Sequence, residues 1–215
     1  MNTNTAEELE DYGPWKFADA PEEARQAAIG KWREHGPDYD WWDCVYANFT
    51  EDMTEKGIQV DEIYFSGFSS QGDGACFEGS ISDLNQFLDA NFDADKFPVI
   101  RLLDKLGGGV SFRTKHTGRY CHAYSVSSDF ETDSWENCHS YDEEDLRYMA
   151  LQALMENFDR ECTEFEEASL EVFRDYMQQL YKDLESEYDY LMSDEAITET
   201  MEANDYTIDE DGDII

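Results

Sequence analysis

Cysteine and histidine stand next to each other at two places in this sequence, Cys121-His122 and Cys138-His139. Cys76 and His116 are further residues of the same two types. Thiol and imidazole groups are common zinc ligands and common partners in nucleophilic catalysis. Adjacent side chains of a strand point to opposite faces, so a neighbouring pair cannot readily share one ion. The chain has neither C-x-x-C nor H-x-x-x-H spacing, and no residue is evident that would orient a cysteine–histidine pair. We therefore expect no metal ion, no cofactor and no cysteine nucleophile.

The most specialised local stretch runs from Tyr64 to Gly79 and reads YFSGFSSQGDGACFEG. Its glycines can adopt positive φ in a tight loop, and such loops sometimes present backbone N–H groups to an anion. No lysine lies in or near it, so a structural hairpin turn is favoured over a phosphate-binding or catalytic loop. The alternative that stays open is an enzyme or ligand-binding domain centred on residues 66–79. Its polar groups, with His122 nearby, would be Gln71, Asp73, Cys76 and Glu78.

Carboxylates dominate the composition, with 52 acidic residues against 15 basic ones and a formal net charge of −37. Such a charge destabilises a compact fold through self-repulsion. Aromatic residues make up 14% of the chain, which argues against a disordered acidic polymer. The explanations for the charge are mimicry of a nucleic-acid backbone, binding of a basic partner or binding of multivalent cations. Adaptation to a high-salt habitat is the competing explanation.

The acidic excess is concentrated in residues 131–215, which hold 28 acidic and four basic residues. Many of these acids, Glu161 and Glu166 among them, recur at helical spacing on the side away from an apolar stripe, and helical neighbours three or four apart lie ~5–6 Å from each other. We predict a partner-binding acidic face made of Glu156, Asp159, Glu164, Glu167, Glu171 and Asp175. Because opposite charges are scarce there, the face is expected to stand in for phosphates.

The expected partner of this face is a basic or nucleic-acid-binding protein, whose association would be fast and sensitive to salt. Nucleic acid itself and anionic membranes would be repelled. An antitoxin-like protein that neutralises a basic toxin would use the same electrostatics, so that alternative stays open.

The hydrophobic pattern predicts an α+β fold, in which an antiparallel sheet core of about four strands carries flanking helices and is followed by a long acidic C-terminal helical region. The expected strands are IQVDEIYFSGF, ACFEGSI, GVSFRTK and RYCHAYSVS, the last two joined by a turn at His116-Thr117-Gly118. Helices are expected from Pro21 to Gly36, over 82–92 and over 99–106. The aromatic side chains expected to be at least partly buried are Phe65, Phe68, Phe77, Phe112, Tyr120 and Tyr124.

Apolar residues from Leu146 to Leu191 recur at three- and four-residue steps, which predicts helix. One helix over 142–192 would be about 75 Å long at ~1.5 Å per residue, so we expect two helices bent near Cys162–Glu167. The stripe is expected to face either the sheet or a second copy of the chain, so a homodimer stays possible. Ser193 should cap a short helix through Ala203, and a short strand is possible at 206–208.

These patterns divide the chain into four segments: an aromatic helical segment over 1–54, an α+β core over 55–130, an acidic helical region over 131–205 and an acidic tail over 206–215. No stretch approaches 18 consecutive apolar residues, and the N-terminus has neither the basic region nor the apolar core of a secretory signal. The five cysteines are an odd number without disulfide-framework spacing. We therefore expect reduced thiols and a cytoplasmic location.

Three segments together resemble a family of bacteriophage and prophage proteins, often described as antitoxin-like or without an assigned activity. They are IYFSGFSSQGDGACFEG, GRYCHAYSV and LESEYDYLMSDEAITETMEANDY, which follow one another in the family's order within residues 25–210. The resemblance implies a phage or prophage origin and a host bacterial cytoplasm. It carries over no catalytic residue. By analogy with other very acidic phage proteins, it suggests an inhibitor that occupies the DNA-binding site of a restriction or other defence enzyme.

The charge predicts that thermal stability depends on ionic strength. Repulsion among carboxylates is screened over a Debye length of ~30 Å at 0.01 M salt and ~3 Å at 1 M. We expect the melting temperature at pH 7 to rise as sodium chloride increases across that range, as measured by scanning calorimetry. A melting temperature that falls with added salt would show that the acids are mostly compensated by ion pairs.

Overall fold

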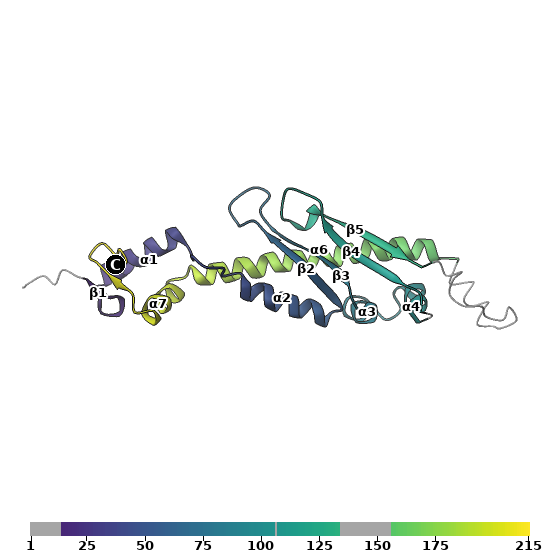
Figure 1. Cartoon of the computed structure of the whole chain (residues 1–215), viewed down its shortest axis with the longest axis horizontal. Helices are drawn as coiled ribbons and strands as arrows, with labels where there is room; N and C mark the ends of the chain where they lie inside the picture. Colours follow the sequence, from purple (N-terminus) through teal and green to yellow (C-terminus); the bar gives the residue numbers. More distant parts are fainter. Residues whose placement is uncertain (1–13, 106, 134–155) are drawn as a thin grey trace, which may run out of the picture. The chain divides into compact units, whose positions relative to one another are not determined.

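The structure is a computed structural model that describes residues 14–105, 107–133 and 156–215 (Figure 1). In chain order its elements are β1 (Trp15–Lys16), the 3-10 turn η1 (Phe17–Asp19), α1 (Glu22–His35), α2 (Asp43–Glu55), β2 (Ile58–Phe65), β3 (Ala75–Ile81), α3 (Leu84–Asn91), α4 (Pro98–Lys105), β4 (Val110–His116), the 3-10 turn η2 (Ala123–Ser125), β5 (Val126–Thr132), α6 (Phe158–Leu191), α7 (Asp194–Ala203) and β6 (Thr207–Ile208). The predicted α+β class is confirmed. Among the described residues, no helix is both long enough and apolar enough to span a bilayer.

The chain divides into two compact units, one made of residues 1–41 and 186–215 and the other of residues 42–185. The units group the elements differently from the four segments expected from the sequence. Helix α2 belongs with the sheet, whereas α1 belongs with α7 and the tail. The boundary at residue 185 falls inside α6.

The larger unit is built on a four-stranded antiparallel sheet in the order β2-β3-β4-β5. Phe77 of β3 touches both Phe49 of α2 and Phe173 of α6, so both helices cover the same face of the sheet. The opposite face carries exposed polar side chains, including an ion pair of 3.6 Å between Lys115 and Asp129. One buried and one solvated face is the usual arrangement of an antiparallel sheet.

Phe173 lies at the centre of an aromatic core. Its ring centroid is 5.4 Å from Phe77, 5.2 Å from Phe112 and 6.1 Å from Phe87, and all four side chains are fully buried. Two turns earlier along α6, Phe165 contacts Phe87 as well, with ring centroids 6.4 Å apart. The apolar stripe of α6 therefore packs on the sheet of its own chain over the described residues. The burial predicted for Phe65, Phe68, Phe77 and Phe112 is also confirmed.

The hairpin of β4 and β5 exists, but its second strand is not where the sequence predicted it. The pairing runs from Val110 opposite Thr132 to His116 opposite Val126, so residues 117–125 form a loop and not a strand. Within that loop the Nδ1 of His122 accepts the N–H of Tyr124, and such local bonds compete with strand pairing. The prediction that Tyr120 and Tyr124 are partly buried is wrong, because the loop leaves them 50% and 68% exposed.

The predicted bend near Cys162–Glu167 is also wrong, since α6 is one helix of 34 residues. The sequence there contains no proline or glycine that would kink it. Its inward positions, Cys162, Phe165 and Ser169, stay on one face and continue the buried stripe without a break.

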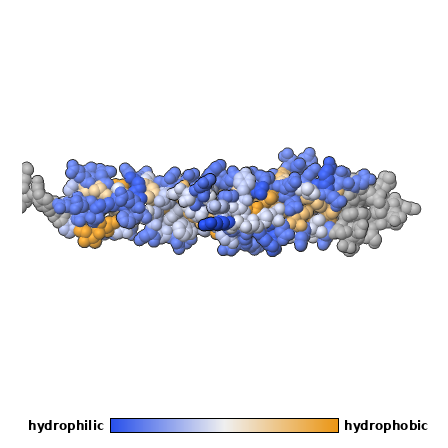
Figure 2. Space-filling model, turned by 90° about the horizontal axis from the view of Figure 1, so that it is seen from above, coloured by the Kyte–Doolittle hydropathy of each residue, from blue (hydrophilic) through white to orange (hydrophobic). Residues whose placement is uncertain are grey.

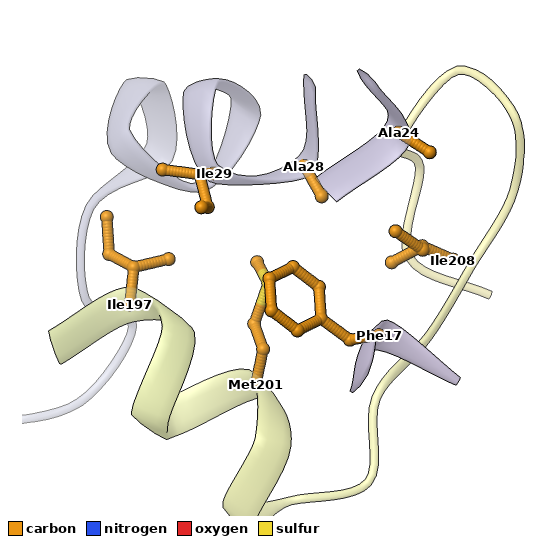
Figure 3. Close-up of a cluster of buried hydrophobic side chains, with 7 residues drawn as sticks. All are labelled: Phe17, Ala24, Ala28, Ile29, Ile197, Met201 and Ile208. Carbon is orange, nitrogen blue, oxygen red and sulfur yellow. The ribbon is translucent and has the colours of Figure 1, made fainter. Parts of the chain in front are cut away.

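The smaller unit has its own apolar core, made of Phe17, Ala24, Ala28, Ile29, Ile197, Met201 and Ile208 (Figure 3). Helix α1 follows Pro21 and ends at Gly36, whose φ of +70° few other residues tolerate. Helix α7 begins as predicted, with the Ser193 hydroxyl accepting the N–H of Ala196 at 3.2 Å. The predicted strand near 206–208 is β6, which pairs with β1.

Two acids expected on the solvent side of α6 point inward. Glu161 is only 7% exposed, and its Oε1 accepts the N–H groups of Val99 and Ile100 at 2.6 and 3.0 Å. These are first-turn donors of α4, which have no partner inside their own helix and favour a negative charge. Glu166 is half-buried and accepts the hydroxyl of Ser128 at 2.8 Å. Both acids therefore stabilise the fold through hydrogen bonds between α6 and other elements.

Replacing Glu161→Ala should destabilise the larger unit by about 1–3 kcal/mol, because two buried N–H groups lose their acceptor. Glu161→Gln keeps an oxygen acceptor and should lose less. The matched control is Glu167→Ala on the exposed side of the same helix, expected to stay within about 0.5 kcal/mol of the parent. Urea unfolding measures all three, and equal losses for Glu161→Ala and Glu167→Ala would contradict the buried-cap role.

Candidate functional site

The predicted acidic face lies on the exposed side of α6, away from the aromatic core. Glu164, Glu167, Glu171 and Asp175 are all exposed and follow one another at three- and four-residue steps, which places them in one row; we call these four residues the acidic row. The row extends over about 16 Å, or ~5–6 Å per charge. One DNA strand carries a charge every ~3.4 Å, so the row is sparser than a phosphate backbone. Glu156 and Asp159 are exposed at the N-terminal end of the helix.

Few basic groups compensate the acidic row. Arg160 lies 3.8 Å from Glu164, and Arg174 lies 2.5 Å from Glu171. Exposed pairs of this kind contribute little to stability. Glu167 and Asp175 form no ion pair with any described residue. The face of the molecule seen in Figure 2 is mostly hydrophilic. The acidic row keeps most of its negative charge, because only two of its four carboxylates have an ion-pair partner among the described residues.

The acidic row is linked to the loop between β4 and β5 through Arg174. The guanidinium of Arg174 lies 5.2 Å from the ring centroid of Tyr124 while it pairs with Glu171. Tyr124 is in turn adjacent to His122, with ring centroids 6.4 Å apart. A continuous surface therefore runs from the carboxylates of α6 to exposed aromatic rings.

The glycine-rich loop between β2 and β3 packs against the β4–β5 loop, and both lie at the same end of the sheet (Figure 1). Gly72 has φ of +101°, and a Cβ at this position would come 2.5 Å from the ring of Tyr120. A Cβ on Gly74 would come 2.6 Å from the carbonyl oxygen of Cys121. These glycines allow close packing of two loops, which explains the motif without an anion.

Asp73 organises the β2–β3 loop from within. Its Oδ2 accepts the N–H groups of Ser69 and Ser70 at 2.9 and 2.6 Å. Its other oxygen, Oδ1, has no hydrogen-bond donor among the described residues. Glu78 is likewise structural, because its carboxylate accepts the N–H of His116 at 2.9 Å where β4 diverges from β3.

One pocket of about 220 Å³ lies between the two loops and α6. Its lining residues are Asp73, Gly74, Ala75, His122, Ala123, Met177, Gln178, Tyr181 and Lys182. Of the loop residues singled out from the sequence, it includes Asp73 and the nearby His122. Gln71 is exposed outside it, and Cys76 and Glu78 do not line it.

The residues that α6 contributes to this pocket were not identified from the sequence. Met177 and Tyr181 are four residues apart, which is the spacing of the apolar stripe of α6. Nothing else in the sequence distinguishes them from core residues of the helix. Burial raises the pKa of the Tyr181 hydroxyl, with smaller contributions from the negative charges of Glu185 and Asp73. Asp73 is therefore the carboxylate among the lining residues of the pocket, and Lys182 is the lining residue of opposite charge.

Cys76 is not arranged as a nucleophile. It is fully buried, and burial raises the pKa of its thiol to about 12, helped by Cys121 and Glu78. A thiol that stays protonated at neutral pH is a poor nucleophile and metal ligand. Among the described residues, no group of three or more His, Cys, Asp or Glu side chains is placed to hold a metal ion. Cys138 and His139 lie outside the described residues.

The sequence profile of a family described as "Domain of unknown function (DUF8835)" matches residues 41–194. The chain belongs to this family. The matched range contains the sheet, the acidic row and the loop pocket. No significant match was found among curated proteins or among solved structures. The family description states no activity and no source, so the phage origin implied by the sequence resemblance is an expectation.

The buried state of Cys76 predicts its chemical reactivity. With a thiol pKa of about 12, less than about one part in a thousand is thiolate at pH 8. Iodoacetamide at pH 8 should leave Cys76 unmodified in the native protein and alkylate it after unfolding in urea, as measured by peptide mass spectrometry. Cys162, whose burial raises its pKa to about 11, should behave alike. Rapid native alkylation of Cys76 would restore the enzyme interpretation.

Proposed function

We propose that this protein is a non-enzymatic binding protein whose acidic row occupies a basic, nucleic-acid-binding surface of another protein. The observation that carries the proposal is the line of four exposed carboxylates on one continuous helix, two of them without an ion pair among the described residues. Together with the resemblance to phage proteins, this suggests a bacterial host enzyme of defence or restriction as the partner.

The rigidity of α6 favours such a role. Phe165 and Phe173 fix the rotation of the helix against the sheet, so the acidic row is held in place before a partner arrives. A preorganised surface loses little conformational entropy on binding. Carboxylates of one sign also steer a basic partner and accelerate association at low salt.

The spacing of the row indicates how far mimicry extends. With a charge every ~5–6 Å, the row presents fewer negative groups per length than a DNA strand with one every ~3.4 Å. It is suited to ion pairs with individual lysine and arginine side chains and offers no counterpart of base edges. We therefore propose that it competes for the phosphate-contacting residues of its partner and does not read out a sequence-specific site.

The antitoxin-like alternative uses the same surface against a basic toxin. The two functions predict different results in cells, because an antitoxin-like protein would restore growth when it is co-expressed with its cognate toxin. The catalytic alternative at residues 66–79 has less support, since Gln71, Cys76 and Glu78 do not line the pocket that contains Asp73.

The test is affinity capture from bacterial lysate at low salt with the full chain as bait. We expect recovery of a basic, nucleic-acid-handling protein that a DNA or RNA oligonucleotide displaces. A variant combining Glu164→Gln, Glu167→Gln, Glu171→Gln and Asp175→Asn should bind that protein at least about tenfold more weakly, since several ion pairs of ~0.5 kcal/mol or more are lost.

The matched control removes four exposed carboxylates outside the acidic row, Glu34, Glu51, Glu55 and Glu199, by substitution to Gln. Its total charge equals that of the row variant, so it should retain most of the affinity. Equal weakening by both variants would show that overall charge, and not the row, determines binding. Recovery of no basic protein at low salt would reject the proposal.

A further inference from the structure

We infer that the loop pocket, formed by the β2–β3 loop, the β4–β5 loop and α6, receives one arginine side chain of the basic partner. This inference rests on the proposed function and names a specific contact within it. The pocket lies beside the acidic row, because Tyr124 of the β4–β5 loop contacts Arg174 of α6, which pairs with Glu171.

The size of the pocket fits a single side chain. Its volume is about 220 Å³, below the ~300–1,000 Å³ typical of sites for small molecules. Ala75, Ala123 and Met177 provide apolar lining, against which the methylene stem of an arginine can pack while its charged end reaches polar groups.

Polar groups around the pocket suit a cation. The Oδ2 of Asp73 accepts hydrogen bonds from two loop N–H groups, whereas Oδ1 has no hydrogen-bond donor among the described residues. A carboxylate with a vacant oxygen is a natural acceptor for guanidinium N–H groups. The carboxylates of Asp73 and Glu185 both lie close enough to the Tyr181 hydroxyl to contribute to its raised pKa, after burial as the main cause. Lys182 is the one cationic side chain of the lining and opposes this preference.

Aromatic rings favour arginine over lysine. His122 and Tyr181 are both lining residues of the pocket, and the ring of Tyr181 packs against Phe68 with centroids 5.5 Å apart. A planar guanidinium stacks on aromatic faces, which a compact ammonium does less well. The neighbouring contact of Arg174 with Tyr124 at 5.2 Å shows that this loop already accommodates one guanidinium. Exposed tyrosines beside a pocket are also typical of binding hot spots.

The inference can be tested with the full chain and a defined probe, the blocked tripeptide acetyl-Gly-Arg-Gly-amide. Its counterpart with citrulline has nearly the same shape and no charge. In NMR titrations of the isotope-labelled protein, the arginine peptide should shift the backbone amides of residues 73–75 and 122–123, and the citrulline peptide should not.

Two opposite substitutions decide the sign of the ligand's charge. Asp73→Asn keeps an oxygen for Ser69 and Ser70 and should weaken arginine-peptide binding about fivefold or more. Lys182→Met removes the opposing cation and should strengthen it. The matched controls are Glu131→Gln, at the opposite end of the sheet, and Lys105→Met, both exposed. They change the total charge equally and should leave the affinity unchanged.

Several results would overturn the inference. The first is that the citrulline peptide shifts the same backbone amides equally, and the second is that the arginine peptide shifts only amides of the acidic row. The third is that Asp73→Asn strengthens peptide binding and Lys182→Met weakens it, as an anionic ligand would require. If the row variant loses the captured partner and Asp73→Asn does not, the arginine pocket is wrong and the proposed function stands. If the peptide binds the pocket as expected and no basic partner is captured, the proposed function alone fails.

Discussion

The packing of α6 on the sheet is the constraint on which the rest of the larger unit depends. Phe173 meets Phe77 and Phe112 from two strands and Phe87 from α3. Aromatic contacts of this density bury a large apolar area and fix the helix in one rotation. That rotation decides which carboxylates of α6 reach solvent and which are used inside. The charge pattern of the surface is thus a consequence of the core.

Several acids of this chain stabilise the fold through hydrogen bonds to backbone N–H groups. Glu161 caps α4, Glu78 satisfies the N–H of His116 where two strands separate, and Asp73 holds the β2–β3 loop. A carboxylate that accepts backbone N–H groups replaces hydrogen bonds that the chain cannot otherwise make. Such internal uses explain part of the acidic composition. They do not explain the acidic row, whose members face solvent with few counter-charges.

The surface charge and the loop pocket are parts of one region. Two glycines let the β2–β3 and β4–β5 loops pack closely, and the second loop then reaches α6 through Tyr124 and Arg174. This arrangement brings exposed aromatic rings next to a row of carboxylates. Aromatic residues supply contact area at an interface, and charges supply steering and orientation. The proposed function uses the two features together, whereas adaptation to salt would require only a uniformly acidic surface.

The sequence by itself determined the elements that depend on local signals. The α+β class and the helix caps at Ser193 and Gly36 follow from periodicity and capping residues that act within one or two turns. Only the tertiary structure decided the start of β5 at Val126, the burial of Glu161 and the meeting of Asp73 with Tyr181. The last two depend on contacts between segments more than sixty residues apart in the sequence, and β5 starts at Val126 because that residue pairs with the last residue of β4. The helical spacing that places a carboxylate on one face does not say what that face will pack against.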